Sequence, residues 1–201
     1  MLLALTGGIA TGKSTFRQLL AARHSFVVFD ADACVHELLS ADRPAIDAVV
    51  QRFGAGVLGL DGCVSRPALR SVVFHDPAAR RDLEQILHPL VRARWQEQRG
   101  DCLASGRDFL ADIPLLFETS AEAHFDASVL VAASAGTQRA RLAARGLDPA
   151  TMEAMLASQL PLGEKIARAT SVVWNDGTPA ALGRQADLLL KRLSLLQPCR
   201  T

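Results

Sequence analysis

The sequence predicts an α/β fold in which helices flank a small parallel sheet of five strands. Short apolar runs alternate with stretches whose apolar residues recur at helical spacing, a pattern typical of βαβ units. The run Phe26–Asp30 (FVVFD) is apolar at nearly every position, as expected for a strand buried on both faces. The chain has 201 residues, of which 49% are hydrophobic and 21% charged. This length and composition indicate one domain with a sizeable core, carrying insertions.

The predicted strands are all short, as central strands of a small parallel sheet usually are. They are Leu2–Thr6, Phe26–Asp30, Phe109–Ile113, Ser128–Ala132 and Ser171–Trp174. Helices are expected at Ser14–Arg23, which places Phe16, Leu19 and Leu20 on one face, and at Pro179–Leu196, where leucines recur every three or four residues.

Two helical insertions interrupt this alternation. The first runs roughly from Ala33 to Arg99, and its last helix should end or kink near His88 because Pro89 follows. The second covers about Gly146 to Arg168. The predicted organisation is a core of residues 1–32, 100–145 and 169–201, an insert at 33–99 and a second at 146–168.

Composition excludes several classes of function. Lys and Arg (22) balance Asp and Glu (21), and the chain has no Tyr, which disfavours a nucleic-acid binder with a basic stripe and stacking aromatics. The four cysteines lack zinc-site spacing and are expected to be reduced thiols. No signal peptide or membrane span is expected, since no apolar run approaches about 18 residues. We therefore expect a cytoplasmic protein without nucleic-acid or membrane partners; the oligomeric state is open, with a monomer favoured.

The strongest motif is Gly7–Ser14 (GGIATGKS), a full match to G-x-x-x-x-G-K-[ST]. Glycines let such a loop turn its backbone N–H groups toward phosphate oxygens, and the following helix adds its positive end. Lys13 would reach the β- and γ-phosphates, and the Ser14 hydroxyl would ligate Mg²⁺. A plain glycine-rich turn is the alternative, but the apolar run before the loop and the helical pattern after it favour a nucleoside triphosphate site.

Carboxylates follow two predicted strands at the edge where ligands of open α/β sheets bind. Asp30 and Asp32 end the second strand and, if the strand continues, project to the same side. One could take a proton from an attacking hydroxyl or help to hold the metal, and one could instead cap the next helix. Asp112 ends the third strand as a candidate metal-side acid or the start of a turn.

Three further candidates are less specific. Arg145 lies one helical turn after Arg141, and could neutralise the transferring phosphoryl group or be a solvated helix end. His88 is either a core residue at the kink or part of a site. Asn175 begins a turn that could be plain or could border the adenine.

Taken together, these residues resemble the dephospho-coenzyme A kinase family over nearly the whole chain. The motifs that carry the resemblance keep a fixed order: LTGGI at 5–9, GKST at 12–15, DAD at 30–32, R-x-x-L-x-x-x-V-F at 66–74, HP at 88–89, IPLLFE at 113–118, R-L-x-x-R at 141–145, Gln159, EK at 164–165 and Asn175. Each is weak alone, but their joint order and spacing are specific.

The resemblance implies a P-loop NTPase core, an acceptor-binding helical insert at 33–99 and a lid at 146–168. It implies Mg²⁺-dependent transfer of a phosphoryl group from ATP to the ribose 3′-hydroxyl of dephospho-coenzyme A, the last step of coenzyme A synthesis. Asp32 would be the base, with Lys13 and Arg145 as the other catalytic residues and Ser14 as the metal ligand. The residues implied to bind ATP are Gly8, Ala10, Thr11, Gly12, Lys13, Ser14, Thr15 and Asn175. Those implied on the acceptor side, besides Asp32, are Arg66, His88, Leu115 and Glu118.

Two departures from the family pattern concern backbone and charge. Ala10-Thr11 stands where the family usually has Gly-Ser, so we expect Ala10 to adopt a backbone conformation open to non-glycine residues. Ala169-Thr170 stands where Ala-Asp is common, so position 170 has no carboxylate. Two alternatives remain for the function: another nucleotide or metabolite kinase, such as a nucleoside monophosphate kinase, and a non-enzymatic nucleotide switch or ATPase module.

Overall fold

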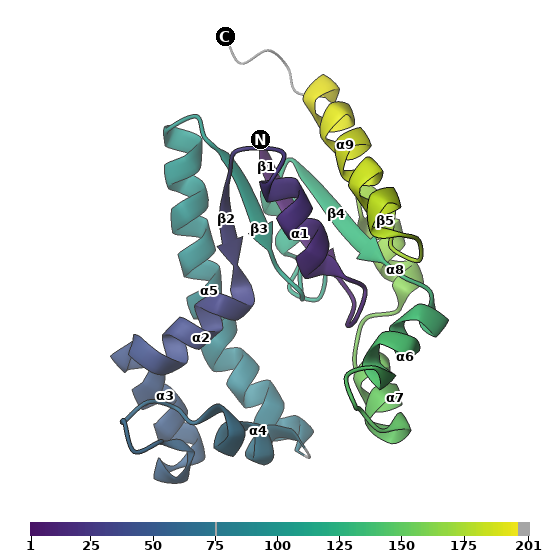
Figure 1. The fold of residues 1–201 in the computed structure, drawn as a ribbon. Coiled ribbons are helices and arrows are strands. Elements are labelled where there is room, and N and C mark those ends of the chain that lie inside the picture. Colours follow the sequence, from purple (N-terminus) through teal and green to yellow (C-terminus); the bar gives the residue numbers. More distant parts are fainter. Residues whose placement is uncertain (75, 197–201) are drawn as a thin grey trace. The chain divides into compact units, whose positions relative to one another are not determined.

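The structure, a computed structural model, describes residues 1–74 and 76–196 and builds them into alternating strands and helices (Figure 1). Cys199, one of the expected thiols, lies outside the described residues. The strands are β1 (Leu2–Gly7), β2 (Phe26–Asp30), β3 (Asp108–Asp112), β4 (Ala127–Ala132) and β5 (Ser171–Trp174). The helices are α1 (Lys13–Ala21), α2 (Ala31–Ala41), α3 (Arg43–Phe53), α4 (Arg66–Phe74), α5 (Pro77–Ala104), α6 (Ala135–Ala143), α7 (Pro149–Ala157), α8 (Leu162–Arg168) and α9 (Pro179–Leu196), with short 3₁₀ turns η1 (Ala55–Val57) and η2 (Ala121–His124).

The five strands form one sheet in the order β2-β3-β1-β4-β5, which confirms the predicted fold class. β1 pairs in parallel with β3 on one side and with β4 on the other, and β4 pairs in parallel with β5. The chain therefore leaves β1 in the middle of the sheet, with strands reached later in sequence on both sides. Open α/β sheets bind ligands at the carboxyl ends of their strands where the strand order reverses, and here that place is the end of β1.

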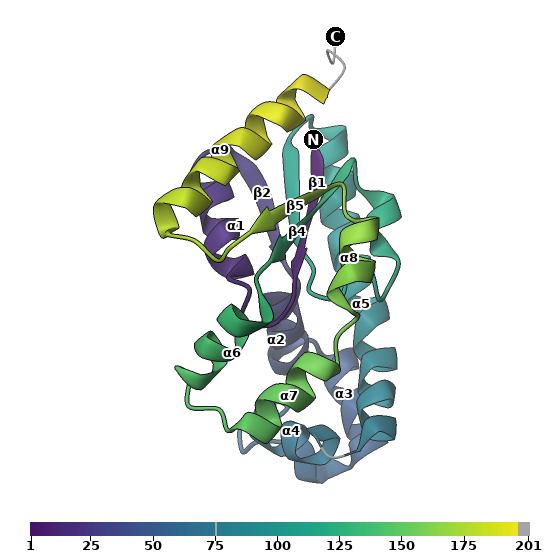
Figure 2. The same ribbon diagram turned by 90° about the vertical axis from the view of Figure 1, so that its right-hand side faces the viewer.

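The chain divides into two compact units. The first comprises Met1–Val28 and the described residues from Cys102 onward. Within it, α1 and α9 cover one face of the sheet and α8 lies on the other (Figure 2). The α1 and α9 face buries an apolar core from both helices and the central strands. Its fully or nearly fully buried members include Leu3, Leu5, Phe16, Leu20, Val129, Val131, Leu182 and Ala186.

The second unit, Phe29–Asp101, is helical and has an apolar core of its own. That core includes Leu39, Ile46, Val49, Leu69 and Leu87, from four helices. Of the two outcomes expected near His88, a helix end or a kink, the helix end is wrong, because α5 continues through Pro89 to Ala104. Proline removes one backbone donor at a cost of about 3 kcal/mol. Burial of apolar side chains on either side of it, Leu87 before and Val91 and Trp95 after, offsets that cost.

Among the described residues, none of the helices is both long enough and apolar enough to span a bilayer.

Candidate active site

The glycine-rich loop lies between the carboxyl end of β1 and the start of α1. Gly12 is the residue before the helix, and its φ of 87° falls in the left-handed region that glycine adopts without strain. No side chain caps this end of α1, so its first N–H groups remain available. Uncapped N–H groups at a helix start, aided by the helix dipole, form an anion site.

The peptide groups of the loop are held from outside by four side chains. Three consecutive carbonyl oxygens accept hydrogen bonds: Ile9 from Gln138 Nε2 (2.7 Å), Ala10 from Arg141 (3.0 Å) and Thr11 from Asn175 Nδ2 (2.8 Å). The Ile9 N–H donates to Gln159 Oε1 at 3.0 Å. Since the C=O and N–H of a peptide point in opposite directions, carbonyls fixed outward leave the N–H groups that follow them directed into the loop.

Ala10 occupies a backbone conformation that the sequence argument excluded. Its φ is 58°, in the left-handed region, whereas we expected a conformation open to non-glycine residues. This conformation costs an alanine about 1–2 kcal/mol. The surroundings impose it, because the carbonyl is bonded to Arg141 and the methyl is buried against Leu142 and Met152.

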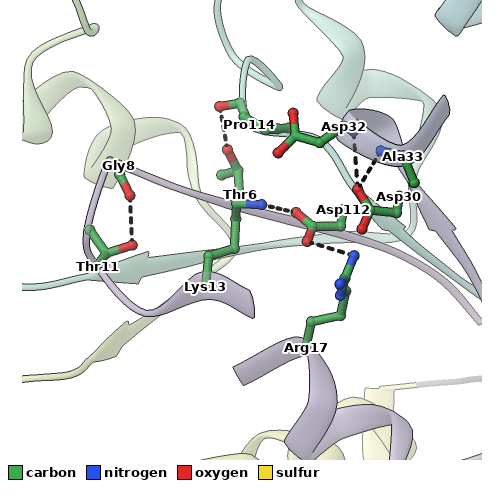
Figure 3. Close-up of polar contacts among 10 residues, drawn as sticks. All are labelled: Thr6, Gly8, Thr11, Lys13, Arg17, Asp30, Asp32, Ala33, Asp112 and Pro114. Atoms are coloured by element: carbon green, nitrogen blue, oxygen red, sulfur yellow. Dashed lines mark hydrogen bonds and ion pairs between the residues drawn. The ribbon is translucent and has the colours of Figure 1, made fainter. Parts of the chain in front are cut away.

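Lys13, the predicted phosphate-binding lysine, forms an ion pair with Asp112 (Figure 3). The Asp112 carboxylate is 2% exposed and also lies 3.4 Å from the Arg17 guanidinium. Its place is set by the sheet, where Asp112 is in register with Leu5 at the carboxyl end of β3. Asp112 therefore carries the counter-charge for two cations of α1.

The two carboxylates at the carboxyl end of β2, Asp30 and Asp32, have different surroundings. Asp30 caps α2, accepting hydrogen bonds from the N–H groups of Asp32 (3.0 Å) and Ala33 (3.2 Å), as Figure 3 shows. The helix begins at Ala31, so Asp32 is helical and the expected same-side projection along a strand does not apply. Asp32 is exposed in the first turn of α2, and Asp30 supplies the cap.

Two acceptor-side candidates follow β3. Leu115 is half-buried, and the Glu118 carboxylate lies 3.0 Å from Lys165 Nζ on α8, without a regular hydrogen bond. The Lys165 ammonium is almost fully buried, so the two form an ion pair with one partner inside the protein. Arg168, one turn further along α8, lies over the Phe117 ring. The segment after β3 is thus held to α8 at two points.

Other predicted site residues occupy defined positions within their own units. Arg145 is exposed and follows the end of α6, with its backbone N–H bonded to the Leu142 carbonyl. In the second unit, Arg66 is the exposed first residue of α4, and His88 is half-buried within α5.

A cavity of about 210 Å³ lies beside the loop within the first unit. Its polar lining includes Thr11, Gln138, Gln159 and Lys165. Part of this lining belongs to the 146–168 segment, so that segment contributes to the immediate surroundings of the loop.

The turn after β5 ties the start of α6 to the same edge of the sheet. Asp176 accepts hydrogen bonds from the Ser134 N–H (2.9 Å) and hydroxyl (2.9 Å). Hydrogen bonds from the Thr137 side chain and from Ser134 hold the pKa of Asp176 below its ordinary value. Thr170, by contrast, lies at the amino end of β5, where it exchanges backbone and hydroxyl hydrogen bonds with Ser128 of β4. Position 170 therefore contributes to the contact between β4 and β5, and its lack of a carboxylate does not change the hydrogen bonds of the phosphate loop.

The chain is similar to known proteins along most of its length. A family model described as Dephospho-CoA kinase matches residues 1–180. The chain belongs to the dephospho-CoA kinase family. The Dephospho-CoA kinase of Anaeromyxobacter dehalogenans is 49% identical over 193 residues, covering 95% of this chain and 91% of that protein. That of Methylococcus capsulatus is 39% identical over 197 residues, covering 98% of each chain.

Solved structures share the fold of this chain. TT1252 from Thermus thermophilus superposes with a TM-score of 0.77 at 33% identity, covering 98% of both chains. The Dephospho-CoA kinase of Campylobacter jejuni has the same fold, with a TM-score of 0.65 at 23% identity over 95% of this chain and 96% of that one.

Sequence reasoning assigned no role to Gln138, Gln159 or Lys165. Gln159 and Lys165 stood among the motifs of the dephospho-CoA kinase family, but only as markers of resemblance. The spacing of Arg141 from Arg145 indicates neighbours on one helix face and gives no sign of the hydrogen bond from Arg141 to the Ala10 carbonyl. A side chain that bonds to a distant backbone group leaves no periodic pattern in the sequence.

Replacing Gly12 with alanine should strongly impair nucleotide binding. A Cβ at this position would lie 2.2 Å from the Asn175 side-chain nitrogen, and the φ of 87° would be strained for alanine. Loop and side chain must separate, which breaks the hydrogen bond to the Thr11 carbonyl. We expect the Kd for ATP, measured by calorimetric titration, to rise at least about tenfold, equivalent to the loss of about 1.4 kcal/mol. Gly54→Ala, also at positive φ but with open space for a Cβ, is the control and should leave the Kd unchanged.

Proposed function

We propose that this chain phosphorylates the ribose 3′-hydroxyl of dephospho-coenzyme A with ATP, giving coenzyme A and ADP. The observation that carries the proposal is the oriented phosphate loop at the uncapped start of α1. It supports a nucleoside triphosphate as donor. Membership of the dephospho-CoA kinase family supports the acceptor.

On the donor side, the loop residues from Gly8 to Thr15 would hold the triphosphate. Lys13 would shift from Asp112 toward the β- and γ-phosphates, since a phosphate group offers more negative charge than the carboxylate it leaves. Asp112 keeps Arg17 at 3.4 Å when Lys13 moves, which limits the cost of separating the pair. Asn175 anchors the loop through the Thr11 carbonyl and would border the adenine.

Mg²⁺ fits the donor groups present. Among the residues that the structure describes, no cluster of three or more His, Cys, Asp or Glu forms a metal cage. Such a cage is not required, because Mg²⁺ in kinases is held by one or two protein oxygens, substrate phosphates and water. Ser14, exposed on the first turn of α1, offers a hydroxyl for this purpose. The ion would neutralise charge on the transferring phosphoryl group.

For the chemical step, Asp32 would accept the proton of the attacking 3′-hydroxyl. Its carboxylate is exposed at the start of α2, and Asp30 already supplies the helix cap, so Asp32 is available for this role. Arg145, exposed where α6 meets the 146–168 lid, would stabilise charge on the phosphoryl oxygens. Closure of the lid would exclude water, which otherwise competes as acceptor.

The acceptor residues are those that the resemblance to the dephospho-CoA kinase family implies. We assign this side to Arg66, His88, Leu115 and Glu118, with Arg66 as the cation for an acceptor phosphate. The Lys165 ion pair would keep the Glu118 carboxylate in one position. The spacing of the four cysteines in the sequence favours reduced thiols, and on that ground we propose a cytoplasmic location.

The direct test is ADP release from Mg²⁺-ATP with and without dephospho-coenzyme A, with the product analysed by mass. We expect acceptor-dependent ADP release and a product heavier by one phosphate at the ribose 3′ position. Faster phosphorylation of AMP or CMP in the same assay would assign the chain to nucleoside monophosphate kinases instead. Equal ADP release without any acceptor would indicate an ATPase.

A further inference from the structure

The two peptide groups that flank Ala10 are both held by α6. The peptide before Ala10 carries the Ile9 carbonyl, bonded to Gln138, and the peptide after it carries the Ala10 carbonyl, bonded to Arg141. The φ and ψ angles of a residue describe how these two planes are rotated about its Cα. Fixing both planes therefore fixes the conformation of Ala10.

Gln138 and Arg141 are suited to act as a pair. They lie three residues apart on α6, hence on the same face of the helix. The start of α6 is itself anchored, because Ser134 caps the helix and is bonded to Asp176. The Ala10 methyl packs against Leu142 of the same helix. The strained conformation of Ala10 is thus imposed by a rigid neighbouring element.

We propose that Gln138 and Arg141 are positioning residues that hold Ala10 in its left-handed conformation and so orient the loop N–H groups for the ATP phosphates. Without them, an alanine relaxes to negative φ, turning the Ile9 and Ala10 peptides and misdirecting the N–H groups of Ala10 and Thr11. A glycine at position 10 adopts positive φ without strain and needs much less of this support. The support from α6 should therefore matter more in a chain that carries alanine here than in one that carries glycine.

The test is a double-mutant cycle between Gln138→Leu and Ala10→Gly, with ATP affinity and steady-state kinetics as readouts. Gln138→Leu keeps the size of the side chain and removes its donor. In the parent protein it should raise the Kd and KM for ATP about tenfold, with a smaller effect on kcat. In the Ala10→Gly background the same change should raise them less than about threefold. An equal factor in both backgrounds would overturn the proposal.

A matched control separates positioning from general loosening. Gln185 on α9 uses its amide in the same way, bonding the Trp174 N–H (3.1 Å) and carbonyl (2.8 Å). Gln185→Leu should change the Kd and KM for ATP by the same factor in the parent protein and in the Ala10→Gly background. If it couples to position 10 as strongly as Gln138→Leu does, Ala10→Gly acts through global stability and the proposal fails.

A second readout needs no nucleotide, since the affinity measurement rests on the proposed function. Amide hydrogen exchange over residues 8–16, without ATP, should be about tenfold faster in Gln138→Leu than in the parent. In the same segment, the Gln138→Leu/Ala10→Gly double variant should exchange less than about threefold faster than the Ala10→Gly single variant. If the parent fails to bind ATP, the proposed function is wrong, and the exchange data still decide whether α6 holds the loop. If the exchange factors are equal in the two backgrounds, the loop inference is wrong whatever the enzyme does.

Discussion

Replacing Asp32 with asparagine is expected to lower kcat by about 10²–10⁴-fold while leaving the Kd for ATP nearly unchanged. The variant keeps the size of the side chain but cannot accept a proton, and a positioned general base contributes about this factor. Because Asp32 is exposed and does not cap its helix, thermal stability should also change little. Steady-state kinetics with dephospho-coenzyme A, together with ATP titration and a melting curve, measure all three quantities.

Asp30 provides a matched control two residues away. Asparagine retains the side-chain oxygen that accepts the N–H groups of Asp32 and Ala33, so Asp30→Asn should preserve the cap of α2. We expect near-normal kcat for this variant. If Asp30→Asn loses turnover and Asp32→Asn does not, Asp30 rather than Asp32 is the general base. Normal turnover in both variants would remove the general base from this segment.

Replacing Lys13 with methionine should lower kcat/KM for ATP by about 10²–10³-fold. Loss of one pre-oriented group that stabilises transition-state charge has an effect of this size. Methionine retains the aliphatic stem, so the change removes mainly the ammonium. The Asp112 carboxylate loses one of its two cations, but Arg17 stays at 3.4 Å, and the protein should remain folded. Kinetics over a range of ATP concentrations separate the effect on KM from that on kcat.

The control for this variant is the same substitution at Lys191, an exposed lysine on α9. Lys191→Met should leave kcat/KM unchanged. Wild-type kinetics for Lys13→Met would contradict the assignment of this lysine to the phosphates, and its pairing with Asp112 would then be a purely structural contact.

The features that were predictable from sequence are those with a local pattern. Each βαβ unit repeats an apolar run followed by a helical period, so the bounds of β2 and β5 match the prediction to the residue, and α9 begins at the predicted Pro179. The phosphate loop was predictable because spacing along the chain fixes it. The cap of α2 could be narrowed only to Asp30 or Asp32, because both carboxylates lie within reach of the same helix start and the first helical residue decides between them.

Other features depend on contacts between distant segments. The left-handed conformation of Ala10 follows from α6, more than 120 residues later in the chain, and the sequence of the loop alone favoured the opposite conclusion. The continuation of α5 through Pro89 also reflects packing on both sides of the proline rather than local preference. In both cases tertiary contacts outweigh a local backbone cost of about 1–3 kcal/mol.

The hydrogen bond from the Ile9 N–H to Gln159 attaches the chain just after the 146–158 segment to the phosphate loop. The helix before this segment, α6, holds the phosphate loop through Gln138 and Arg141, and Gln159 holds the same loop just after α7 ends. The residues on both sides of this segment are therefore hydrogen-bonded to the same phosphate loop. If the backbone is cleaved at the exposed turn near Gly146, the chain on each side of the cut keeps its hydrogen bonds to the phosphate loop, so the two fragments should stay associated. Insertions or deletions within residues 146–158 should likewise leave the phosphate loop in place, because the hydrogen bonds that hold the loop lie outside this segment.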